Sequence, residues 1–378
     1  MFALPAAVLI KRRRKDLWLI CDNGKEAADN GFVFFKYLCK TQPEQDCVFA
    51  VCKDSPDRER VEEVGKSVAY GSFKHWVLYL TARVNISSQK GGKPNAAVCY
   101  LLEVYGLLKN NRVFLQHGVI LTNIEFLYYK NTGMSLFVTS AAREYEYVRD
   151  NYGYPDGAVK LLGLPRFDML HNLPPPKKQI LIMPTWREWL GNSSFVKNTD
   201  KNISDFLETE YYHRYLELIN NKKLKKLCEN KDFTVMFYLH REAQRFADCF
   251  SSGNKYLVIC KYPEYRVDEL LKSSAFLITD YSSIQTDFAY MKKPLCYFQF
   301  DYGRFSEEHY KKGYFDYEKD GFGPVFKAAD EVAEYVTELA EKGFKNPDKY
   351  RIRQNNFFSF HDAENCKRVF KAIKEKWS

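Results

Sequence analysis

Four short segments place polar or cationic side chains directly after apolar runs that predict β-strands. They are His117-Gly118, residues 184–188 (PTWRE), His240-Arg241 and residues 280–283 (DYSS). In open parallel sheets, ligands bind just beyond the carboxyl ends of the strands. Histidine exchanges protons near neutral pH, and arginine captures phosphate oxygens with two parallel hydrogen bonds. These residue types at these positions therefore suit acid–base chemistry on a phosphorylated ligand.

Each segment also has a purely structural interpretation. A histidine after a strand is often a surface loop residue, and Arg187 can pair with a neighbouring acid. Ser282 or Ser283 can simply cap the helix expected over residues 284–291. Capping and anion binding use the same exposed N–H groups at the positive end of a helix, so the two interpretations are compatible. The four segments together are more informative than any one of them.

Apolar runs alternate with helical patterns along nearly the whole chain, which predicts parallel sheets with helices on both faces. Residues 173–178 (LPPPKK) are typical of an interdomain linker. We therefore predict an α/β fold of two Rossmann-like, doubly wound domains that face each other across a cleft. The predicted domains are residues 1–173 and 174–360, followed by a helical segment, residues 361–378, that can pack back on the first domain. The expected strands are residues 16–21, 46–51, 68–71, 84–88, 112–116 and 135–139 in the first domain, and 179–183, 233–239, 256–260, 275–279 and 295–300 in the second.

Composition narrows the classes of partner. The 378 residues include 57 Lys and Arg against 48 Asp and Glu, a formal charge of +9, and are 46% hydrophobic. Such a chain is not disordered, and its charge favours nucleic acid, anionic lipid or a phosphorylated ligand. Ten scattered cysteines without a CxxC pair fit a reducing cytoplasm.

The first residues suggest a membrane surface rather than a membrane span. No apolar run approaches the roughly 20 residues that a spanning helix needs. Residues 1–10 are apolar, and the basic run Lys11–Lys15 follows them. This arrangement suits either the surface of an anionic membrane or a solvated turn before the first strand.

Several familiar motifs are absent from the sequence. No GxGxxG follows a predicted strand, and no Gly-x-Ser-x-Gly is present. There is also no Asp-x-Asp pair, with which metal-dependent single-domain glycosyltransferases hold a nucleotide-bound cation. What remains is a cleft with two histidines, two arginines and a helix N-terminus. That set suits a nucleotide-diphosphate donor handled without an obligatory metal, so we expect no metal site and no required cofactor.

The ordered set of motifs resembles the CDP-glycerol glycerophosphotransferase family of teichoic acid primases and polymerases and related capsule polymerases. The resemblance spans about residues 16–370 and implies the GT-B architecture, with the acceptor on the N-terminal domain and the CDP-activated donor on the C-terminal domain. It implies transfer of glycerol phosphate, or another polyol phosphate, to a hydroxyl of a lipid-linked or polymeric acceptor, with release of CMP. The matching segments are residues 28–31 (ADNG), 115–118 (LQHG), 163–168 (GLPRFD), 184–187 (PTWR), His240, residues 279–283 (TDYSS) with Asp287, 312–318 (KGYFDYE) and 323–325 (GPV).

The resemblance also suggests roles for the strand-end residues. His117 is the expected general base, and His240 is expected to contact the donor phosphates and to assist the departure of CMP. Neutralising phosphate charge is the main task in such a reaction. Gln116 stands where many relatives have Trp, and Arg241 stands where they often have Pro, so substrate identity stays more open than reaction type. The residues expected to bind the donor are Thr185, Arg187, Arg241, Asp280, Ser282 and Ser283.

Two other functions stay open on the sequence alone. A GT-B glycosyltransferase that uses a sugar nucleotide would share the fold. A nucleic-acid-binding protein would share the positive charge, but the chain lacks a dense basic and aromatic stripe, so we expect no nucleic acid partner. The polyol, the acceptor, the number of units added, help from a divalent cation and the oligomeric state are not determined. We expect a cytoplasmic enzyme that is peripheral on the inner face of a bacterial cell membrane.

Overall fold

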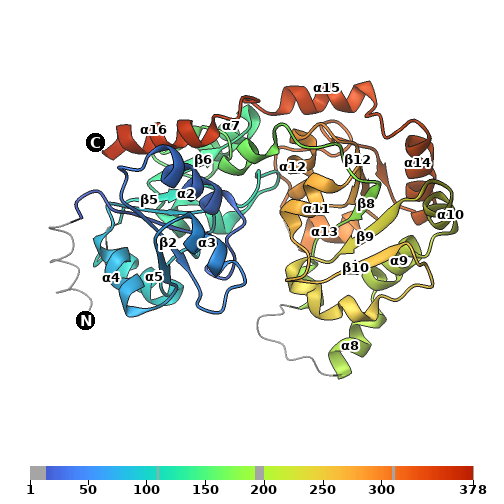
Figure 1. Cartoon of the computed structure of the whole chain (residues 1–378), viewed down its shortest axis with the longest axis horizontal. Helices are drawn as coiled ribbons and strands as arrows, with labels where there is room; N and C mark the ends of the chain where they lie inside the picture. The colour runs from blue at the N-terminus through green and yellow to red at the C-terminus, as the bar shows by residue number, and fades with distance from the viewer. Residues whose placement is uncertain (1–13, 109, 192–199, 309–310, 378) are drawn as a thin grey trace. The chain divides into compact units, whose positions relative to one another are not determined.

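The computed structural model describes residues 14–108, 110–191, 200–308 and 311–377 (Figure 1). The chain divides into two compact units. Unit 1 contains Met1–Val119, Ile124–His171 and Phe358–Ser378, and unit 2 contains Ile120–Asn123 and Asn172–Phe357. The apolar residues 1–10, and residues 11–13 of the predicted basic run, lie outside the described residues.

Unit 1 is built on a seven-stranded sheet in the order β3-β2-β1-β4-β5-β6-β7, with every neighbouring pair parallel. Helices cover both faces, so the central strands are buried on both sides. Their residues are mostly apolar, although the middle strand also buries Asn85 and Ser87. All four residues of β1 are buried. The strands are β1 (Trp18–Cys21), β2 (Cys47–Val51), β3 (Ser67–Ala69), β4 (Val84–Ser87), β5 (Arg112–Phe114), β6 (Leu136–Thr139) and β7 (Val159–Leu161).

Alternate residues of β1 show which helices cover which face. The ring of Trp18 stacks on Phe34 of α2 and contacts Phe370 of α16. Leu19, which points to the opposite face, packs in one apolar cluster with Leu78 of α4. In Figure 1, α2 and α16 accordingly lie on one side of this sheet and α4 and α5 on the other. The helices are α2 (Asn30–Thr41), α3 (Arg58–Val64), α4 (Phe73–Thr81), α5 (Ala96–Val104), α6 (Tyr129–Thr132), α7 (Ala142–Asn151) and α16 (Asn365–Trp377), with short 3-10 helices η1 (Glu125–Leu127) and η2 (Pro165–Leu170).

The last helix, α16, is held on unit 1 by capping and ion pairing. The carboxylate of Asp168 accepts hydrogen bonds from the backbone N–H groups of Asn365 (2.9 Å) and Cys366 (2.8 Å). An acidic group at this position satisfies unpaired N–H groups and favours the positive end of the helix. Near the other end, Lys374 Nζ lies 2.7 Å from Asp16 Oδ2.

Unit 2 is built on a six-stranded sheet in the order β10-β9-β8-β11-β12-β13, again with parallel pairs only. Two of its strands, β11 and β12, are buried along their whole length. The strands are β8 (Gln179–Ile182), β9 (Thr234–Tyr238), β10 (Leu257–Cys260), β11 (Phe276–Thr279), β12 (Leu295–Phe298) and β13 (Val325–Phe326).

The main core of unit 2 lies on one face of this sheet. Ile180 and Ile182 of β8 join an apolar cluster with Leu218 of α9, Leu224 of α10 and Val336 of α14. Helices α11 and α12 contact the sheet as well, and Figure 1 places them on the side away from α9 and α14. The helices are α8 (Asp200–Leu207), α9 (Glu210–Ile219), α10 (Lys222–Lys231), α11 (Val267–Ser273), α12 (Ile284–Tyr290), α13 (Tyr302–Glu308), α14 (Ala329–Glu341) and α15 (Asp348–Phe357), with 3-10 helices η3 (Glu188–Leu190) and η4 (Arg241–Cys249).

The strand order locates one special point in each sheet. The order reverses between β1 and β4 in unit 1 and between β8 and β11 in unit 2, and such a switch point is where doubly wound sheets bind ligands. The predicted α/β fold with two doubly wound parallel sheets is confirmed. Two strands were missed, β7 and β13, because β7 has an exposed Lys160 at its centre and β13 is only two residues long. Several predicted strands were too long, because buried residues continue past the last paired residue into the site loops.

Candidate active site

A buried carboxylate occupies the switch point of unit 1. Asp22 directly follows β1, and its Oδ1 accepts a hydrogen bond from Ser88 Oγ (2.7 Å), just beyond β4. Asp22 also accepts from the backbone N–H groups of Gly31 (2.9 Å) and Phe32 (3.2 Å) at the start of α2. A Cβ atom on Gly31 would lie 2.4 Å from Asp22 Oδ1, so this close approach requires glycine. Asp22 therefore ties β1, β4 and α2 together.

The environment of Asp22 changes its acidity. Burial raises the pKa of Asp22 to about 7, and the negative charge of Asp29 acts in the same direction. The hydrogen bonds from Ser88 and the backbone oppose this rise. A carboxyl that exchanges its proton near neutral pH is typical of a functional site.

His117 reaches the surface through an unusual turn after β5. Gln116 has a φ of +65°, which is uncommon for a residue other than glycine. Its buried amide compensates by donating hydrogen bonds to the Val138 carbonyl (2.5 Å) and to Glu144 Oε1 (3.0 Å). The turn leaves the His117 side chain 68% exposed. This conformation explains how a histidine can follow a buried strand and still reach the surface.

The imidazole of His117 is held by a carboxylate. Its Nδ1 lies 2.6 Å from Asp29 Oδ2, and Asp29 Oδ1 lies 2.8 Å from Arg166 Nη1. The same Arg166 nitrogen also donates to the His117 carbonyl. Burial would raise the pKa of Asp29, but His117 and Arg166 together lower it below its ordinary value. Asp29 is therefore an ionised acceptor between two donors.

Spacing along the sequence assigned no role to Asp29 or Arg166, although both lie in segments that carry the family resemblance. Asp29 could have been predicted as the N-cap of α2, because aspartate is a preferred N-cap residue. In the structure its side chain accepts from the Asn30 N–H (2.8 Å). Its contact with His117, 88 positions away in the chain, arises only from the folded sheet.

The switch point of unit 2 is likewise bridged by a buried aspartate. Asp280 follows β11 and is fully buried. Its carboxylate accepts from the backbone N–H of Thr185, beyond β8, at 2.9 and 3.1 Å, and from the Tyr281 N–H at 2.6 Å. The phenol of Tyr215 donates to it as well (3.0 Å). Asp280 thus holds the loop after β8 against the end of β11.

Arg187 lies inside unit 2, with its side chain fully buried. Its Nη1 lies 2.8 Å from Asp280 Oδ2, and its Nε and Nη2 donate to the two oxygens of Asp301 at 2.7 and 3.1 Å. Burial alone would lower the pKa of Arg187, but Asp280 and Asp301 raise it well above its ordinary value. The structure thus agrees with the structural interpretation of Arg187, in which its side chain pairs with acidic residues. A contact of Arg187 with the donor phosphates stays a prediction. Asp301, which the sequence did not single out, follows β12 and could have been found by the same strand-end rule.

The remaining predicted donor residues lie at strand ends of the same sheet. His240 follows β9, is exposed, and accepts at Nδ1 from the Glu242 N–H (3.3 Å). The guanidinium of Arg241 lies 5.0 Å from the ring centre of Tyr262. Ser282 and Ser283 are half-buried before α12, and the Ser283 hydroxyl makes no capping hydrogen bond. Of the predicted set, the structure brings Thr185, Arg187 and Asp280 into direct contact.

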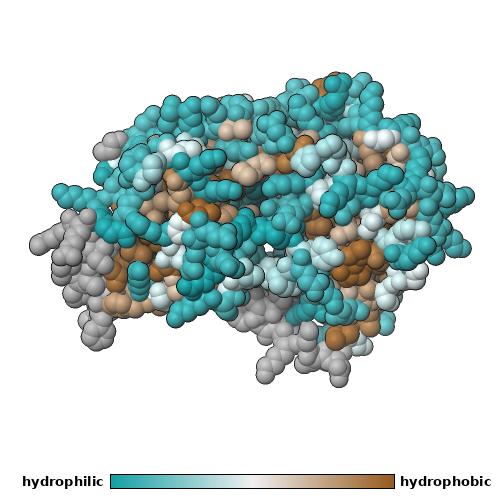
Figure 2. Space-filling model, in the orientation of Figure 1, coloured by the Kyte–Doolittle hydropathy of each residue, from teal (hydrophilic) through white to brown (hydrophobic). Residues whose placement is uncertain are grey.

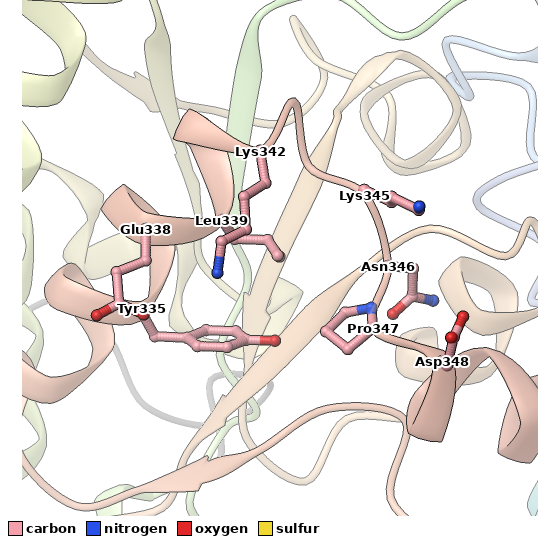
Figure 3. Close-up of a pocket in the computed structure, with 8 residues that line it drawn as sticks. All are labelled: Tyr335, Glu338, Leu339, Lys342, Lys345, Asn346, Pro347 and Asp348. Atoms are coloured by element: carbon pink, nitrogen blue, oxygen red, sulfur yellow. The ribbon is translucent and has the colours of Figure 1, made fainter.

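Two further features of the structure bear on ligand binding. Among the described residues, no three His, Cys, Asp or Glu side chains are grouped to hold a metal ion. A pocket of about 370 Å³ lies in unit 2 between the end of α14 and the start of α15, with the Tyr335 ring pointing across it (Figure 3). Its lysines are balanced by carboxylates, and it contains none of the predicted site residues. It is lined by Tyr335, Glu338, Leu339, Lys342, Lys345, Asn346, Pro347 and Asp348.

Comparison with known families identifies the chain. The family model described as CDP-Glycerol:Poly(glycerophosphate) glycerophosphotransferase matches residues 3–375. The chain belongs to this family. The predicted family is therefore confirmed.

Relatives agree with this assignment. The minor teichoic acid biosynthesis protein GgaB of Bacillus subtilis (strain 168) is 33% identical in an alignment of 376 positions, which covers 96% of this chain and 40% of GgaB. A teichoic acid poly(glycerol phosphate) polymerase of the same organism is 27% identical over 56% of this chain and 28% of its own length. The chain thus spans less than half the length of these two relatives.

Solved structures of the wall teichoic acid polymerase TagF share the fold. A histidine-to-asparagine variant soaked with CDPG superposes with a TM-score of 0.73 and 19% identity, over 98% of this chain and 92% of that one. The complex of Staphylococcus aureus MnaA with UDP gives a TM-score of 0.55 at 13% identity, over 96% of both chains.

Proposed function

We propose that this family member transfers glycerol phosphate, or another polyol phosphate, from a CDP-activated donor to a hydroxyl of a lipid-linked or polymeric acceptor in teichoic acid synthesis. Family membership and the named activities of the relatives support this reaction. The structural observation that carries it is the exposed His117, held by Asp29 at the carboxyl edge of the unit 1 sheet.

The proposed reaction makes one phosphodiester bond and breaks one pyrophosphate bond. The acceptor oxygen attacks the β-phosphorus of the donor, and its proton passes to the imidazole of His117. The bond between the β-phosphorus and the bridging oxygen breaks, and CMP leaves. His240, Arg241 and the hydroxyl groups at residues 282–283 are the unit 2 groups that we assign to the donor phosphates. Electrostatic stabilisation of this kind is the main source of catalysis in phosphoryl transfer.

Donor profiling tests this proposal directly. The purified chain is incubated with a teichoic acid acceptor and either CDP-glycerol, CDP-ribitol or a panel of UDP-sugars, and the released nucleotide is separated by chromatography. We expect CMP from a CDP-polyol and no UDP. Release of UDP from a UDP-sugar would instead support the glycosyltransferase alternative, which the likeness to a UDP-bound fold keeps in view. The length of the product then distinguishes addition of one unit from polymerisation.

We also propose that the enzyme works in the cytoplasm, bound peripherally to the inner face of a bacterial membrane. Among the described residues, no helix is long and apolar enough to cross a membrane. Unit 1 nevertheless exposes large apolar side chains on α5 and in the loop after it, with Tyr105 at 74% and Leu107 at 75% exposed. Figure 2 shows hydrophobic residues at the surface in the region of α4 and α5. Such side chains suit shallow insertion into an interface.

Basic side chains adjoin this apolar surface. Lys93 and Arg112 share one carboxylate, Glu103, at 2.6 and 3.5 Å, but both cations are buried and do not present their charge at the surface. Burial, together with the charge of Arg112, lowers the pKa of Lys93. Lys90 donates to the carbonyl of Phe126 (3.1 Å), whose ring is half exposed. Lys90 is the partly exposed cation of the three, and a positive charge beside exposed apolar groups favours anionic lipid over a neutral surface.

Vesicle binding tests the membrane assignment. Cosedimentation is measured with phosphatidylglycerol and with phosphatidylcholine vesicles at low and high salt. We expect binding to the anionic vesicles only, weakened by salt and by the double variant Leu101→Glu/Leu107→Glu. Ile352→Glu is the matched control, because Ile352 is also an exposed apolar residue (54%) but lies in unit 2. Equal losses in the two variants, or equal binding to both lipids, would contradict the assignment.

A further inference from the structure

We propose that Asp29 is the positioning residue of His117, and that Arg166 holds Asp29 in place. In this arrangement Asp29 orients the imidazole and determines which ring nitrogen carries the proton. The inference rests on the proposed function, because it deepens the role of His117 as the base. It concerns no contact between Asp29 and a substrate.

Contacts on two sides lock the segment that carries His117 onto the start of α2. Asn30 Nδ2 donates to the Gln116 carbonyl (2.8 Å), and Asn30 Oδ1 accepts from the Arg166 N–H (2.9 Å). Arg166 in turn bridges Asp29 and the His117 carbonyl. These hydrogen bonds therefore fix the His117 ring and the backbone before it relative to the carboxylate of Asp29.

The chemistry of the pair determines the tautomer. An ionised carboxylate only accepts hydrogen bonds, so the contact of Asp29 Oδ2 with His117 Nδ1 requires a proton on Nδ1. The lone pair of the neutral ring then resides on Nε2. When Nε2 takes the proton of the acceptor hydroxyl, the resulting imidazolium is stabilised by the nearby negative charge. The same two effects explain why an aspartate partner raises the rate of a histidine base in other enzymes.

Charged groups around the pair come from three elements. Asp29 precedes α2, Arg166 lies in η2, and Asp22 follows β1. Arg166 opposes proton uptake by His117, whereas Asp29 favours it. Asp22 is linked to the pair through the backbone, because its carboxylate accepts a hydrogen bond from the Asp29 N–H (3.2 Å). The ionisation of His117 is thus expected to follow chiefly the carboxylate that it touches.

The variant Asp29→Asn separates positioning from folding. Asparagine is as good an N-cap as aspartate, so α2 keeps its start, but the negative charge is lost. We expect turnover to fall about 100-fold. We also expect the acidic limb of the kcat/KM profile to move to lower pH, because His117 loses the charge that favours its protonated form. In the His117→Ala background the same change should cost less than about threefold. A purely structural role predicts an unshifted profile and a full additional loss.

A spectroscopic measurement keeps this inference separate from the proposed function. The ring nitrogens of His117 are observed by NMR in protein labelled with ¹⁵N-histidine, and the signals are assigned from the spectrum of His117→Ala. We expect the wild-type ring to be protonated at Nδ1 and to titrate at a higher pH than in Asp29→Asn. An unchanged tautomer and titration would overturn the positioning role, even in an active enzyme. Absence of CMP release with an altered titration would refute the function and leave the pair intact.

Discussion

The two switch points are both bridged by a buried aspartate, but the charged or titratable side chain beside each one differs in exposure. In unit 1, Asp22 joins the ends of β1 and β4, and the neighbouring Asp29 presents an exposed histidine. In unit 2, Asp280 joins the ends of β8 and β11, but the cation beside it is a fully buried Arg187. The side chain of His117 is 68% exposed, whereas the side chain of Arg187 is fully buried.

Burial explains why such similar clusters suit different tasks. The fork of Arg187 meets Asp301 under stacked aromatic rings, with Tyr281 and Phe305 centred 3.7 Å apart. Charges in that environment hold one geometry and exchange protons poorly. A histidine near the surface, backed by one carboxylate, can accept and release a proton during turnover. Proximity to the switch point therefore does not by itself make a charged residue reactive.

The largest effect should come from removing the exposed histidines. We expect His117→Ala and His240→Ala each to lower turnover by about two or more orders of magnitude, the usual contribution of an acid–base group. Their melting temperatures should stay near that of the wild type, because both side chains are exposed. CMP release and thermal unfolding measure the two effects. His213→Ala, an exposed histidine on α9, is the control. If both variants keep near wild-type turnover, the site assignment is wrong.

Breaking the ion pairs of Arg187 with Asp280 and Asp301 should affect stability more than turnover. Arg187→Met leaves Asp280 and Asp301 without their cation, and we expect the free energy of unfolding to fall by about 3–5 kcal/mol. Urea unfolding followed by tryptophan fluorescence measures this, since Trp186 and Trp189 lie in the same unit. Arg187→Lys keeps the charge but loses the fork, so it should lie in between. Unchanged stability with lost turnover would instead favour the donor contact that the sequence predicted.

A smaller effect should follow from weakening the contacts of Arg166 with Asp29 and with the His117 carbonyl. Arg166→Lys keeps a positive charge near Asp29 but cannot reproduce the bridge from one guanidinium to Asp29 and to the His117 carbonyl. We expect kcat to fall about 10-fold, the cost of one charge-assisted hydrogen bond, with KM unchanged. Steady-state kinetics measure both parameters. Arg351→Lys, at an exposed position of α15, should change neither. A change confined to KM would assign Arg166 to substrate binding.

The smallest effect concerns the pH dependence of stability. Asp22 has a pKa of about 7 in the folded chain, against about 4 when unfolded, so the folded state binds one more proton between these values. The free energy of unfolding should therefore decrease as pH rises from about 4 to about 7, by at most about 1.4 kcal/mol per pH unit from this group.

Asp22→Asn should flatten that decrease, although it also weakens the hydrogen bonds at the switch point. Urea unfolding at several pH values measures the slope. Asp54→Asn, at an exposed position of the same unit, should leave the slope unchanged. A slope that stays the same in Asp22→Asn would show that Asp22 is ionised throughout this range.

Much of the scaffold could be predicted because its signals are local. Eleven strands follow from apolar runs, and the strand-end rule pointed to His117, His240 and Asp280. The same rule could not tell that Arg187 turns inward, because its acidic partner Asp301 lies 114 positions away. It also missed Asp29 and Arg166, whose importance depends on contacts with His117 across the sheet edge.

The sequence by itself determined the alternation of strands and helices, the family and the strand ends that carry polar residues. These follow from burial of apolar runs and from motif order, which are properties of neighbouring residues. Only the tertiary structure decided which charges are paired and which are exposed. Carboxylates reach the cations from distant strands and helices, and their burial determines whether a charged side chain holds the fold or meets a substrate.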